Sequence, residues 1–411
     1  MKEAYYRAIR IGAAALLLIY PCPPSLPESL TLADLNPPLP LPLSSGTYSV
    51  EDVWEMPSHQ GILAFRVHSP HADYEAESFV ALVKLLHEIE VIERVRTSQE
   101  GSGFFDGFAD SVASTGSGFV RLVSSPGESV KGVGRAFGKL GRKIGGVFQS
   151  QEEGEKSSWG EKMLGGSERE LAKRFGVDAY TRNPYMQELL RRTAKSRIGG
   201  KSAAAIGKLL IPVALLVSVA VTASGVNSAA DHFVNDAGRG DIYEKNYRAL
   251  TAMGFKLSEV RMFLNLPYYT PRESTYIRFY LEKLRGIEGS GCVFQAARSV
   301  MNPEEALAIL YSAQLAADGL AGMPSYKRVA CFQEGVAAEQ AGKLILFSPY
   351  DYLNQGPLGD RVLRRVGELK RAWGLNSAEI RNGGKMTPAF SARAARENVR
   401  MRDWMLFKKE Q

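Results

Sequence analysis

The chain has little cysteine and no apolar run long enough to cross a bilayer. Only three of its 411 residues are cysteines, and Cys22 lies in an N-terminal segment with the features of an export signal. If that signal is removed, Cys292 and Cys331 remain. The sequence leaves two alternatives open for them: a disulfide, which export permits, or two buried thiols. The apolar runs Ile11–Tyr20 and Leu209–Val221 are both shorter than the roughly 20 residues that a spanning helix needs.

The chain also lacks the short motifs of common catalytic sites. It contains no Gly-x-Ser-x-Gly sequence, which excludes the usual nucleophile elbow. Gly200-Lys201-Ser202 is like the end of a phosphate-binding loop, but Lys195 stands where that loop needs a glycine. The glycines of 132–138 lack a preceding strand, so they do not indicate a dinucleotide site. The sequence therefore predicts no catalytic residue and no cofactor.

The five histidines form no recognisable metal motif. His59, His68, His71 and Asp73 could approach one ion, but their spacing matches no closed zinc site. His87 has no second histidine four residues on, which excludes a metalloprotease helix. We therefore predict no metal site.

The features that are present begin with an export signal over residues 1–33. Basic residues precede a short apolar run, which is the order found in secretory signals. Tyr20-Pro21 before Cys22 departs from the small residues of a lipobox, so lipidation of Cys22 is the less favoured alternative. A proline-rich linker over 34–47 follows, and we expect it to be extended and stiff.

A glycine-rich basic segment over 101–150 is the most distinctive feature of the chain. Its apolar residues recur at helical spacing, and residues 120–148 carry six basic residues against one acid. This pattern predicts an amphipathic helix on an anionic membrane or a partner surface. The competing interpretation is that the stripe packs on the protein's own helices, and twelve glycines in 101–146 weigh against a long stable helix in water. The predicted surface comprises Arg121, Lys131, Arg135, Lys139, Arg142, Lys143, Phe119, Val133, Phe137, Leu140 and Ile144.

The net charge of the chain is +7, and most of it falls in this segment. Residues 120–148 have a net charge of +5, and the rest of the chain is close to balanced as a whole. The overall field is therefore not that of a nucleic-acid-binding protein, and we predict no nucleic-acid partner.

Hydrophobic periodicity predicts an α+β fold that is mainly α. Residues 48–100 should form a small β element plus a helix. Polar residues 149–166 should form a loop, and residues 326–411 a small α+β unit. The predicted strands are 48–53, 61–68, 74–79, 329–332, 336–340 and 344–347, and the predicted helices outside the central region are 80–96, 360–373 and 391–401.

The central region, residues 167–325, should be an α-helical bundle. Ser167–Glu170 is a capping box that opens a helix, and Gly176 ends this helix. Three further helices should begin where a capping residue precedes proline. These starts are Asn183-Pro184, Thr270-Pro271 and Asn302-Pro303.

Residues 209–230 contain no charge and could be either core or membrane-inserted. Basic residues precede this segment, which would place its N-terminal side in the cytoplasm, whereas an export signal would place that side outside. We therefore favour a buried central helix over a transmembrane span, and a hairpin that inserts only after a conformational change is the third alternative.

Several stretches resemble a set of uncharacterised exported bacterial proteins. The resemblance is carried by Gly176–Gln187, Ala252–Gly254, Phe263–Asn265 and Tyr269–Pro271, in this order after the glycine-rich segment. It covers roughly residues 48 to 370 and implies export and a shared architecture. It implies no activity and no site residues, and the two late cysteines are a departure from that set.

Together these patterns favour a non-catalytic protein of the cell envelope, periplasmic or peripheral on a membrane. Its expected partner is an anionic membrane surface or an envelope protein. One alternative is a membrane-active protein, pore-forming or toxin-like, that uses residues 203–225. The other is an enzyme without a short motif, for which the Tyr-rich helix around Tyr276 and Tyr280 would be a candidate, although aromatic packing explains that helix better.

Overall fold

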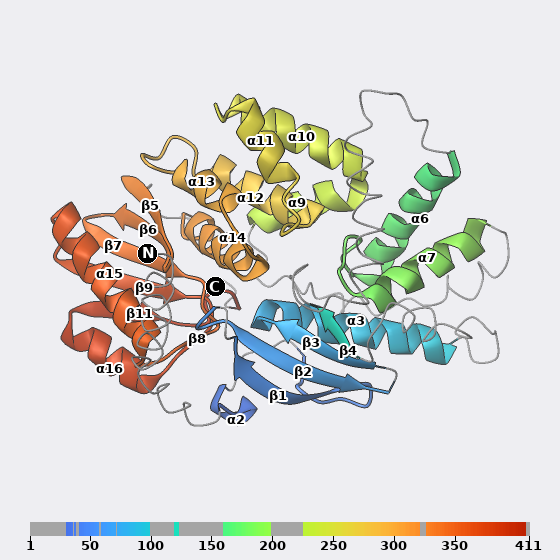
Figure 1. The fold of residues 1–411 in the computed structure, drawn as a ribbon, viewed down its shortest axis with the longest axis horizontal. Helices are drawn as coiled ribbons and strands as arrows, with labels where there is room; N and C mark the ends of the chain where they lie inside the picture. The colour runs from blue at the N-terminus through green and yellow to red at the C-terminus, as the bar shows by residue number, and fades with distance from the viewer. Residues whose placement is uncertain are drawn as a thin grey trace, which may run out of the picture. The chain divides into compact units, whose positions relative to one another are not determined.

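The computed structural model describes residues 30–35, 37, 41–56, 59–70, 72–98, 119–122, 159–198, 225–320 and 326–407. The chain divides into two units, residues 1–36 and 37–411. In the first unit the described helix is α2 (Leu32–Leu35). All further elements belong to the second unit (Figure 1).

A four-stranded sheet and one long helix form the N-terminal part of the second unit. The sheet has the order β1-β2-β3-β4, with antiparallel pairing except between β3 and β4, which are parallel. Helix α3 packs on β2 and β3 and buries Val83, Leu86 and Ile89, as its apolar periodicity predicts. The elements are β1 (Ser49–Glu55), β2 (Leu63–Ser69), β3 (Ala72–Glu77), α3 (Phe79–Ser98) and β4 (Phe119–Leu122).

Strand β4 corrects part of the predicted amphipathic helix. Phe119 and Arg121 lie in a strand whose register pairs Phe119 with Asp73 and Arg121 with Glu75. The helical prediction is wrong for these four residues, because pairing with the edge of β3 satisfies their backbone groups in an extended conformation. The other predicted surface residues lie outside the described residues: Lys131, Arg135, Lys139, Arg142, Lys143, Val133, Phe137, Leu140 and Ile144.

The central part is helical. Its elements are α6 (Trp159–Phe175), α7 (Pro184–Ile198), α9 (Gly225–Asp236), α10 (Arg239–Ala252), α11 (Leu257–Leu264), α12 (Pro271–Lys283), α13 (Cys292–Arg298) and α14 (Pro303–Asp318). The three helices that begin with proline start where the sequence predicts. Thr270 caps α12 in a full capping box with Glu273, and Asn302 caps α14.

Helix α6 begins earlier than predicted. The loop predicted over 149–166 is wrong from Trp159 onward, and Ser167 lies inside the helix rather than at its cap. Helix α6 packs on α7 and α9, and tertiary packing of this kind commonly overrides a local capping signal. The predicted end is confirmed, since Gly176 has a φ of +66°.

The C-terminal part is a five-stranded sheet with helices on both faces. Strands β5, β6 and β7 form an antiparallel meander, and β9 and β11 then add in parallel, in the order β11-β9-β7-β6-β5. A short parallel pair, β8 with β10, lies outside this sheet. The elements are β5 (Arg328–Phe332), β6 (Gly335–Gln340), β7 (Lys343–Ser348), β8 (Tyr352–Leu353), α15 (Pro357–Trp373), β9 (Ser377–Asn382), β10 (Lys385–Met386), α16 (Pro388–Arg396) and β11 (Val399–Arg402).

The helix predicted over 391–401 is wrong in its second half. Helix α16 ends at Arg396, the chain reverses at Asn398 with a φ of +57°, and Val399 starts β11 beside β9. A basic helical pattern cannot reveal this strand, because β11 depends on an edge of β9 supplied by a distant part of the chain.

The core continues across the predicted boundary between residues 325 and 326. Alternate residues of β7 enter two clusters: Phe347 packs with Phe294 and Leu310 from the helices, whereas Leu346 packs with Val362 of α15. Helix α14 therefore covers one face of the sheet, and α15 and α16 cover the other (Figure 1). The structure is α+β and mainly α, and it is not an all-α bundle.

The two late cysteines are paired in the structure. Cys292 at the start of α13 forms a disulfide with Cys331 of β5, with their Cα atoms 5.6 Å apart. The bond ties the helical part to the edge strand of the C-terminal sheet.

In the part of the chain that the structure describes, no helix has both the length and the apolar character required to span a bilayer. The predicted central helix over 209–230 lies outside the described residues up to position 224, and α9 begins at Gly225.

Candidate functional site

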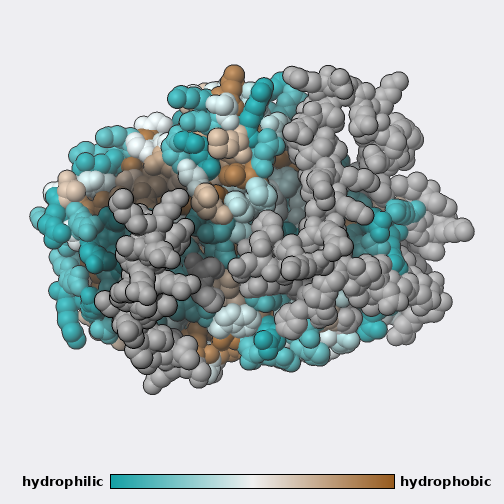
Figure 2. All heavy atoms as spheres, in the orientation of Figure 1, coloured by the Kyte–Doolittle hydropathy of each residue, from teal (hydrophilic) through white to brown (hydrophobic). Residues whose placement is uncertain are grey.

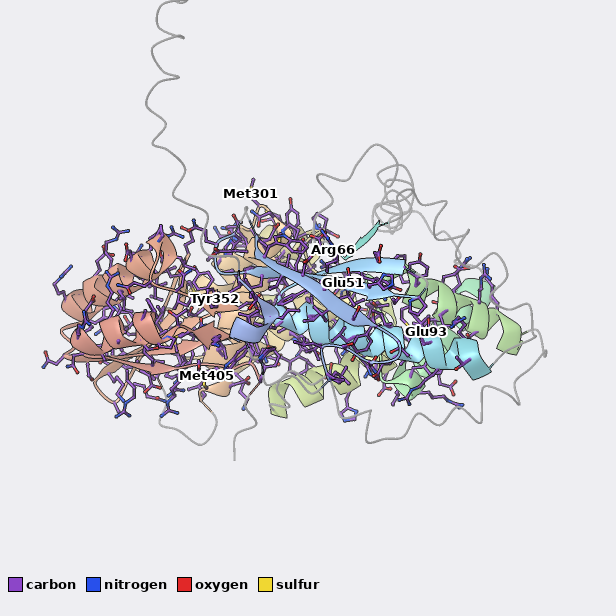
Figure 3. All side chains as sticks on the ribbon, turned by 90° about the horizontal axis from the view of Figure 1, so that it is seen from below. Glu51, Arg66, Glu93, Met301, Tyr352 and Met405 are labelled. Atoms are coloured by element: carbon purple, nitrogen blue, oxygen red, sulfur yellow. A yellow bond between two sulfur atoms is a disulfide. The ribbon has the colours of Figure 1, made fainter. Side chains whose placement is uncertain are left out.

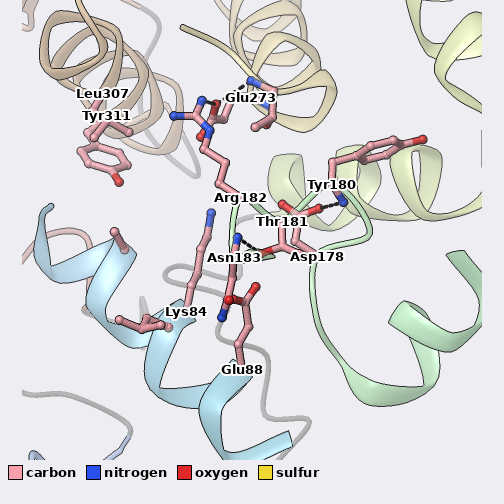
Figure 4. Close-up of a pocket in the computed structure, with 13 residues that line it drawn as sticks. Lys84, Glu88, Asp178, Tyr180, Thr181, Arg182, Asn183, Glu273, Leu307 and Tyr311 are labelled. Carbon is pink, nitrogen blue, oxygen red and sulfur yellow. Dashed lines mark hydrogen bonds and ion pairs between the residues drawn. The ribbon is translucent and has the colours of Figure 1, made fainter. Parts of the chain in front are cut away.

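A small pocket lies where α3, the loop between α6 and α7, α12 and α14 meet. Its volume is about 90 Å³. Figure 4 shows the side chains that enter it from these four elements. The lining residues are Ala81, Lys84, Leu85, Glu88, Asp178, Tyr180, Thr181, Arg182, Asn183, Thr270, Glu273, Leu307 and Tyr311.

The loop that forms one wall is held by its own polar side chains. The carboxylate of Asp178 accepts a hydrogen bond from the Tyr180 N–H at 2.9 Å, which closes an Asx turn. Thr181 Oγ1 accepts from the Asn183 N–H at 3.1 Å, and Asn183 Oδ1 caps α7 through the Tyr185 N–H at 3.0 Å. This local sequence therefore fixes the loop before any ligand is present.

Arg182 is anchored to the start of α12. Its guanidinium donates to the Tyr268 carbonyl oxygen at 2.9 Å and to Glu273 Oε2 at 2.8 Å. Glu273 also accepts from the Thr270 N–H at 2.7 Å, so this carboxylate is fully engaged. The guanidinium is consequently held in one position beside the pocket.

The two buried carboxyl groups of the pocket differ in their electrostatics. Burial raises the pKa of Glu88 to about 7, although Thr181, Asn183 and Lys84 partly offset this effect. Burial alone would also raise the pKa of Asp178, but the charges of Arg272 and Lys84 outweigh it and lower that pKa. Glu88 therefore changes protonation near neutral pH, whereas Asp178 stays ionised.

Arg272 neutralises Asp178 from the side away from the pocket. Its Nε lies 2.9 Å from Asp178 Oδ1, and its Nη1 pairs with Asp231 of α9. Tyr276 donates to the same Asp231 carboxylate at 2.5 Å. The Tyr-rich helix thus supplies a buried ion network and core packing, in agreement with the structural interpretation of that helix.

Lys84 has no ion pair or hydrogen bond among the described residues, although its charge acts on Glu88 and Asp178. In Figure 4 its side chain rises from α3 toward Arg182 and Tyr311. The arrangement combines one uncommitted ammonium group, one anchored guanidinium and one carboxyl group that titrates near neutrality. It can bind an anionic group and exchange a proton with it.

A second candidate site is a basic surface of the C-terminal part. Residues 326–411 contain sixteen Lys and Arg against nine Asp and Glu, a net charge of +7. The charge of the chain outside 120–148 is close to balanced only as a sum. The positive charge of residues 326–411 is offset by acidic residues in other parts of the chain. In Figure 2 the outer rim of this part is hydrophilic.

Helices α15 and α16 form this surface together. They lie side by side, since Arg393 of α16 pairs with Asp360 of α15 and Lys370 of α15 donates to the Glu397 carbonyl oxygen. Both bury their apolar sides against the same face of the sheet. Three exposed arginines face solvent here and are called the cationic face: Arg364, Arg371 and Arg396.

The carboxylates of α15 and those next to α16 already have partners. Asp360 pairs with Arg393, Glu368 with Arg365 at 2.7 Å, and Glu397 lies 3.6 Å from Arg393. The three arginines of the cationic face have no ion pair among the described residues. Their charge is therefore available to an external anion.

The outer face of the N-terminal sheet has a different balance. Arg66 of β2 pairs with Asp52 of β1 at 2.8 Å and also lies over the Trp54 ring; Figure 3 labels Arg66 on this sheet. Exposed large apolar side chains of the described residues, such as Met301 in the same figure, belong to the helical part. Unmatched positive charge thus distinguishes the cationic face from the N-terminal sheet.

The residues proposed from sequence do not meet at either site. Phe119 and Arg121 lie in β4, and the other predicted surface residues lie outside the described residues. His68 pairs with Asp73 at 2.6 Å on the surface, and His59 packs near Tyr350 instead. No group of metal-ligating side chains is found among the described residues.

Lys84, Glu88 and Arg182 were missed by sequence reasoning. Lys84 and Glu88 are four residues apart on a helix, which is normally the sign of an exposed salt bridge. Two stretches that carry the family resemblance, Gly176–Gln187 and Tyr269–Pro271, do both reach the pocket. That coincidence is a signal that could have located it.

No protein-family model matches the chain, and no curated protein or solved structure is significantly similar to it. Function is therefore argued from the two sites.

Proposed function

We propose that this chain is a non-catalytic protein of the cell envelope that docks on an anionic membrane surface. The observation that carries the proposal is the cationic face, where three exposed arginines on α15 and α16 have no acidic partner among the described residues. Nearby carboxylates are already paired, so approach to an anionic surface costs no internal ion pair.

The expected binding is electrostatic and sensitive to salt. Each Lys or Arg near an anionic leaflet contributes about 1 kcal/mol at low ionic strength. Three such residues give measurable affinity, and residues 120–148 would add up to six more cations. Screening with a Debye length of about 3 Å at 1 M salt would remove most of this attraction.

A membrane is favoured over nucleic acid as the partner. Binding of single strands uses exposed aromatic side chains on which bases stack, and no aromatic side chain of α15, α16 or β11 is exposed. The arginines lie on two neighbouring helices rather than along one groove-sized element. This spread suits a flat charged surface.

Export is supported by the disulfide between Cys292 and Cys331. Such bonds persist in oxidising compartments and are rare in the cytosol. The N-terminal sequence over 1–33 has the order of a secretory signal. Both observations support a periplasmic or envelope location with peripheral attachment to a membrane.

Vesicle co-sedimentation of the full chain tests the docking. Binding to phosphatidylglycerol vesicles is compared for the wild type and the triple variant Arg364→Glu, Arg371→Glu, Arg396→Glu. A matched control reverses three exposed cations elsewhere, Lys256→Glu, Lys283→Glu and Arg285→Glu. We expect the first variant to bind at least tenfold more weakly and the control to lose much less. Equal loss in both variants would show that only net charge matters and would overturn the assignment of this face.

Two further experiments distinguish an anionic membrane from other partners. Neutral phosphatidylcholine vesicles should not bind, and duplex or single-stranded nucleic acid should bind no better than a charge-matched polyanion. Fractionation of cells that produce the tagged full chain should recover it with membranes and release it in a high-salt wash. Retention through carbonate would instead indicate insertion and would contradict peripheral attachment.

A further inference from the structure

We propose that the pocket between α3 and the Gly176–Asn183 loop is a binding site for a small oxyanion group, with Lys84 as its principal ligand. The inference is independent of membrane docking, because the pocket and the cationic face share no residue.

Three donor groups line this pocket without a full set of acceptors. The Lys84 ammonium has no partner among the described residues. The Asn183 side chain is 1% exposed, and its Nδ2 forms no hydrogen bond of full geometry, although it lies close enough to Glu88 to lower that pKa. Both of the hydrogen bonds that anchor Arg182 are donated by its Nη2. The other N–H groups of the guanidinium can therefore donate to a ligand.

A buried donor without an acceptor is costly unless a ligand or water supplies one. Leaving such a group unsatisfied costs about 1–3 kcal/mol. A bound oxyanion offers several acceptor oxygens at once and would satisfy the ammonium and amide together. The pocket is thus suited to a ligand rich in acceptors.

The acids of the pocket do not oppose this assignment. Asp178 is paired with Arg272, and Glu273 is paired with Arg182 and with the Thr270 N–H. Glu88 is the third acid of the pocket and has no arginine partner among the described residues. In its protonated form it can donate a further hydrogen bond to an oxyanion.

The size of the pocket limits the ligand. A volume of about 90 Å³ corresponds to roughly six to nine water sites at about 10–15 Å³ each. Sulfate, phosphate or a short carboxylate fits that space. Leu85 and Leu307 add an apolar part to the lining, which suits a short hydrocarbon stem on the anion.

Binding should weaken as pH rises through neutrality, because Glu88 then gains a negative charge. The groups that face it are Lys84 of the same helix, Asp178 and Arg182 of the loop, and beyond them Glu273 and Tyr311. Among these, burial raises the pKa of Tyr311 and pairing lowers that of Asp178, so neither changes charge between pH 6 and 8.

Isothermal titration of the full chain with sulfate tests the proposal, because sulfate itself does not titrate in this range. Titrations at constant ionic strength and at pH 6 and pH 8 compare the wild type with Lys84→Met. Lys283→Met is the matched control, since Lys283 is exposed and has no ion pair among the described residues. Succinate in place of sulfate separates a carboxylate ligand from a tetrahedral one.

We expect saturable binding with one site per chain, at least threefold tighter at pH 6 than at pH 8. Lys84→Met should weaken it at least tenfold, and Lys283→Met should leave it unchanged. Absence of saturable binding by the wild type, or equal affinity in Lys84→Met, would overturn the site. If Lys84→Met does not fold, Glu88→Gln decides, because it should bind with no pH dependence, and a persisting dependence would contradict the proposal.

Discussion

Two interiors of this protein are built on different chemistry. Beneath α15 and α16 the core is almost entirely hydrocarbon, with Val362, Phe390 and Leu346 fully buried. Between α3 and α12 the interior instead holds ionic and titratable groups, including Glu88, Asp178 and Arg272. The first region is stabilised mainly by burial of apolar side chains, whereas the second depends on ion pairs such as that between Asp178 and Arg272. The second interior contains the pocket, and the surface outside the first carries the cationic face.

The largest effect should come from opening the apolar interior. Phe390→Ala removes a ring with 0% exposure that packs closely against Gly359. We expect a loss of about 4 kcal/mol in the free energy of unfolding, measured by urea titration with circular dichroism. A loss below about 1 kcal/mol would mean that this core is not tightly packed.

Removal of one charge should damage the polar interior almost as much. Arg272→Met leaves Asp178 and Asp231 without their cation, and we expect a loss of about 3 kcal/mol at neutral pH. Arg248→Met is the control, because its pair with Glu244 is exposed and should contribute little. If both variants lose the same stability, the buried network has no special role.

The polar interior should also make stability depend on pH. Because burial raises the pKa of Glu88 to about 7, the folded state binds this proton more tightly than the unfolded state, and stability falls as pH rises from about 4.5 to 7. At about 1.4 kcal/mol per pKa unit the effect over this range is roughly 3–4 kcal/mol. Glu88→Gln should remove this part of the slope in denaturant titrations.

In Glu88→Gln the free energy of unfolding should still fall as pH rises, although less steeply. Burial also raises the pKa of Asp351 to about 7, even though its carboxylate accepts from the Leu63 and Phe79 N–H groups. A wild-type stability that is flat from pH 4.5 to 7 would contradict both assignments.

The smallest effect on stability should come from the cationic face. Arg364→Gln changes an exposed residue without an ion pair, and we expect a change within about 0.5 kcal/mol. The same variant should measurably weaken binding to anionic vesicles. A large loss of stability would show that this arginine belongs to the fold rather than to a docking surface.

The apolar interior could be predicted from sequence to a large extent. The periodicity of 360–373 correctly indicates a helix that buries one side, and the strands predicted at 336–340 and 344–347 are present and are buried on both faces. Capping residues before Pro184, Pro271 and Pro303 correctly give the helix starts. These features are local, so neighbouring residues in the chain carry the information.

The polar interior could not be predicted in the same way. Lys84 and Arg182 are 98 positions apart, and Asp178 meets Arg272 only after α6, α7 and α12 have packed. Strand β9 and the β11 edge were missed for the same reason, because parallel pairing depends on distant partners.

The disulfide restricts how the chain can be divided for study. Cys292 and Cys331 lie on either side of residue 325, so a cut at that boundary would leave each fragment with one half of the pair. Each fragment would also expose half of a shared core to solvent. Under oxidising conditions two identical fragments could join through the unpaired Cys292 or Cys331 and be mistaken for a natural dimer. Proteolysis between the two cysteines would be invisible on a gel until a reductant was added.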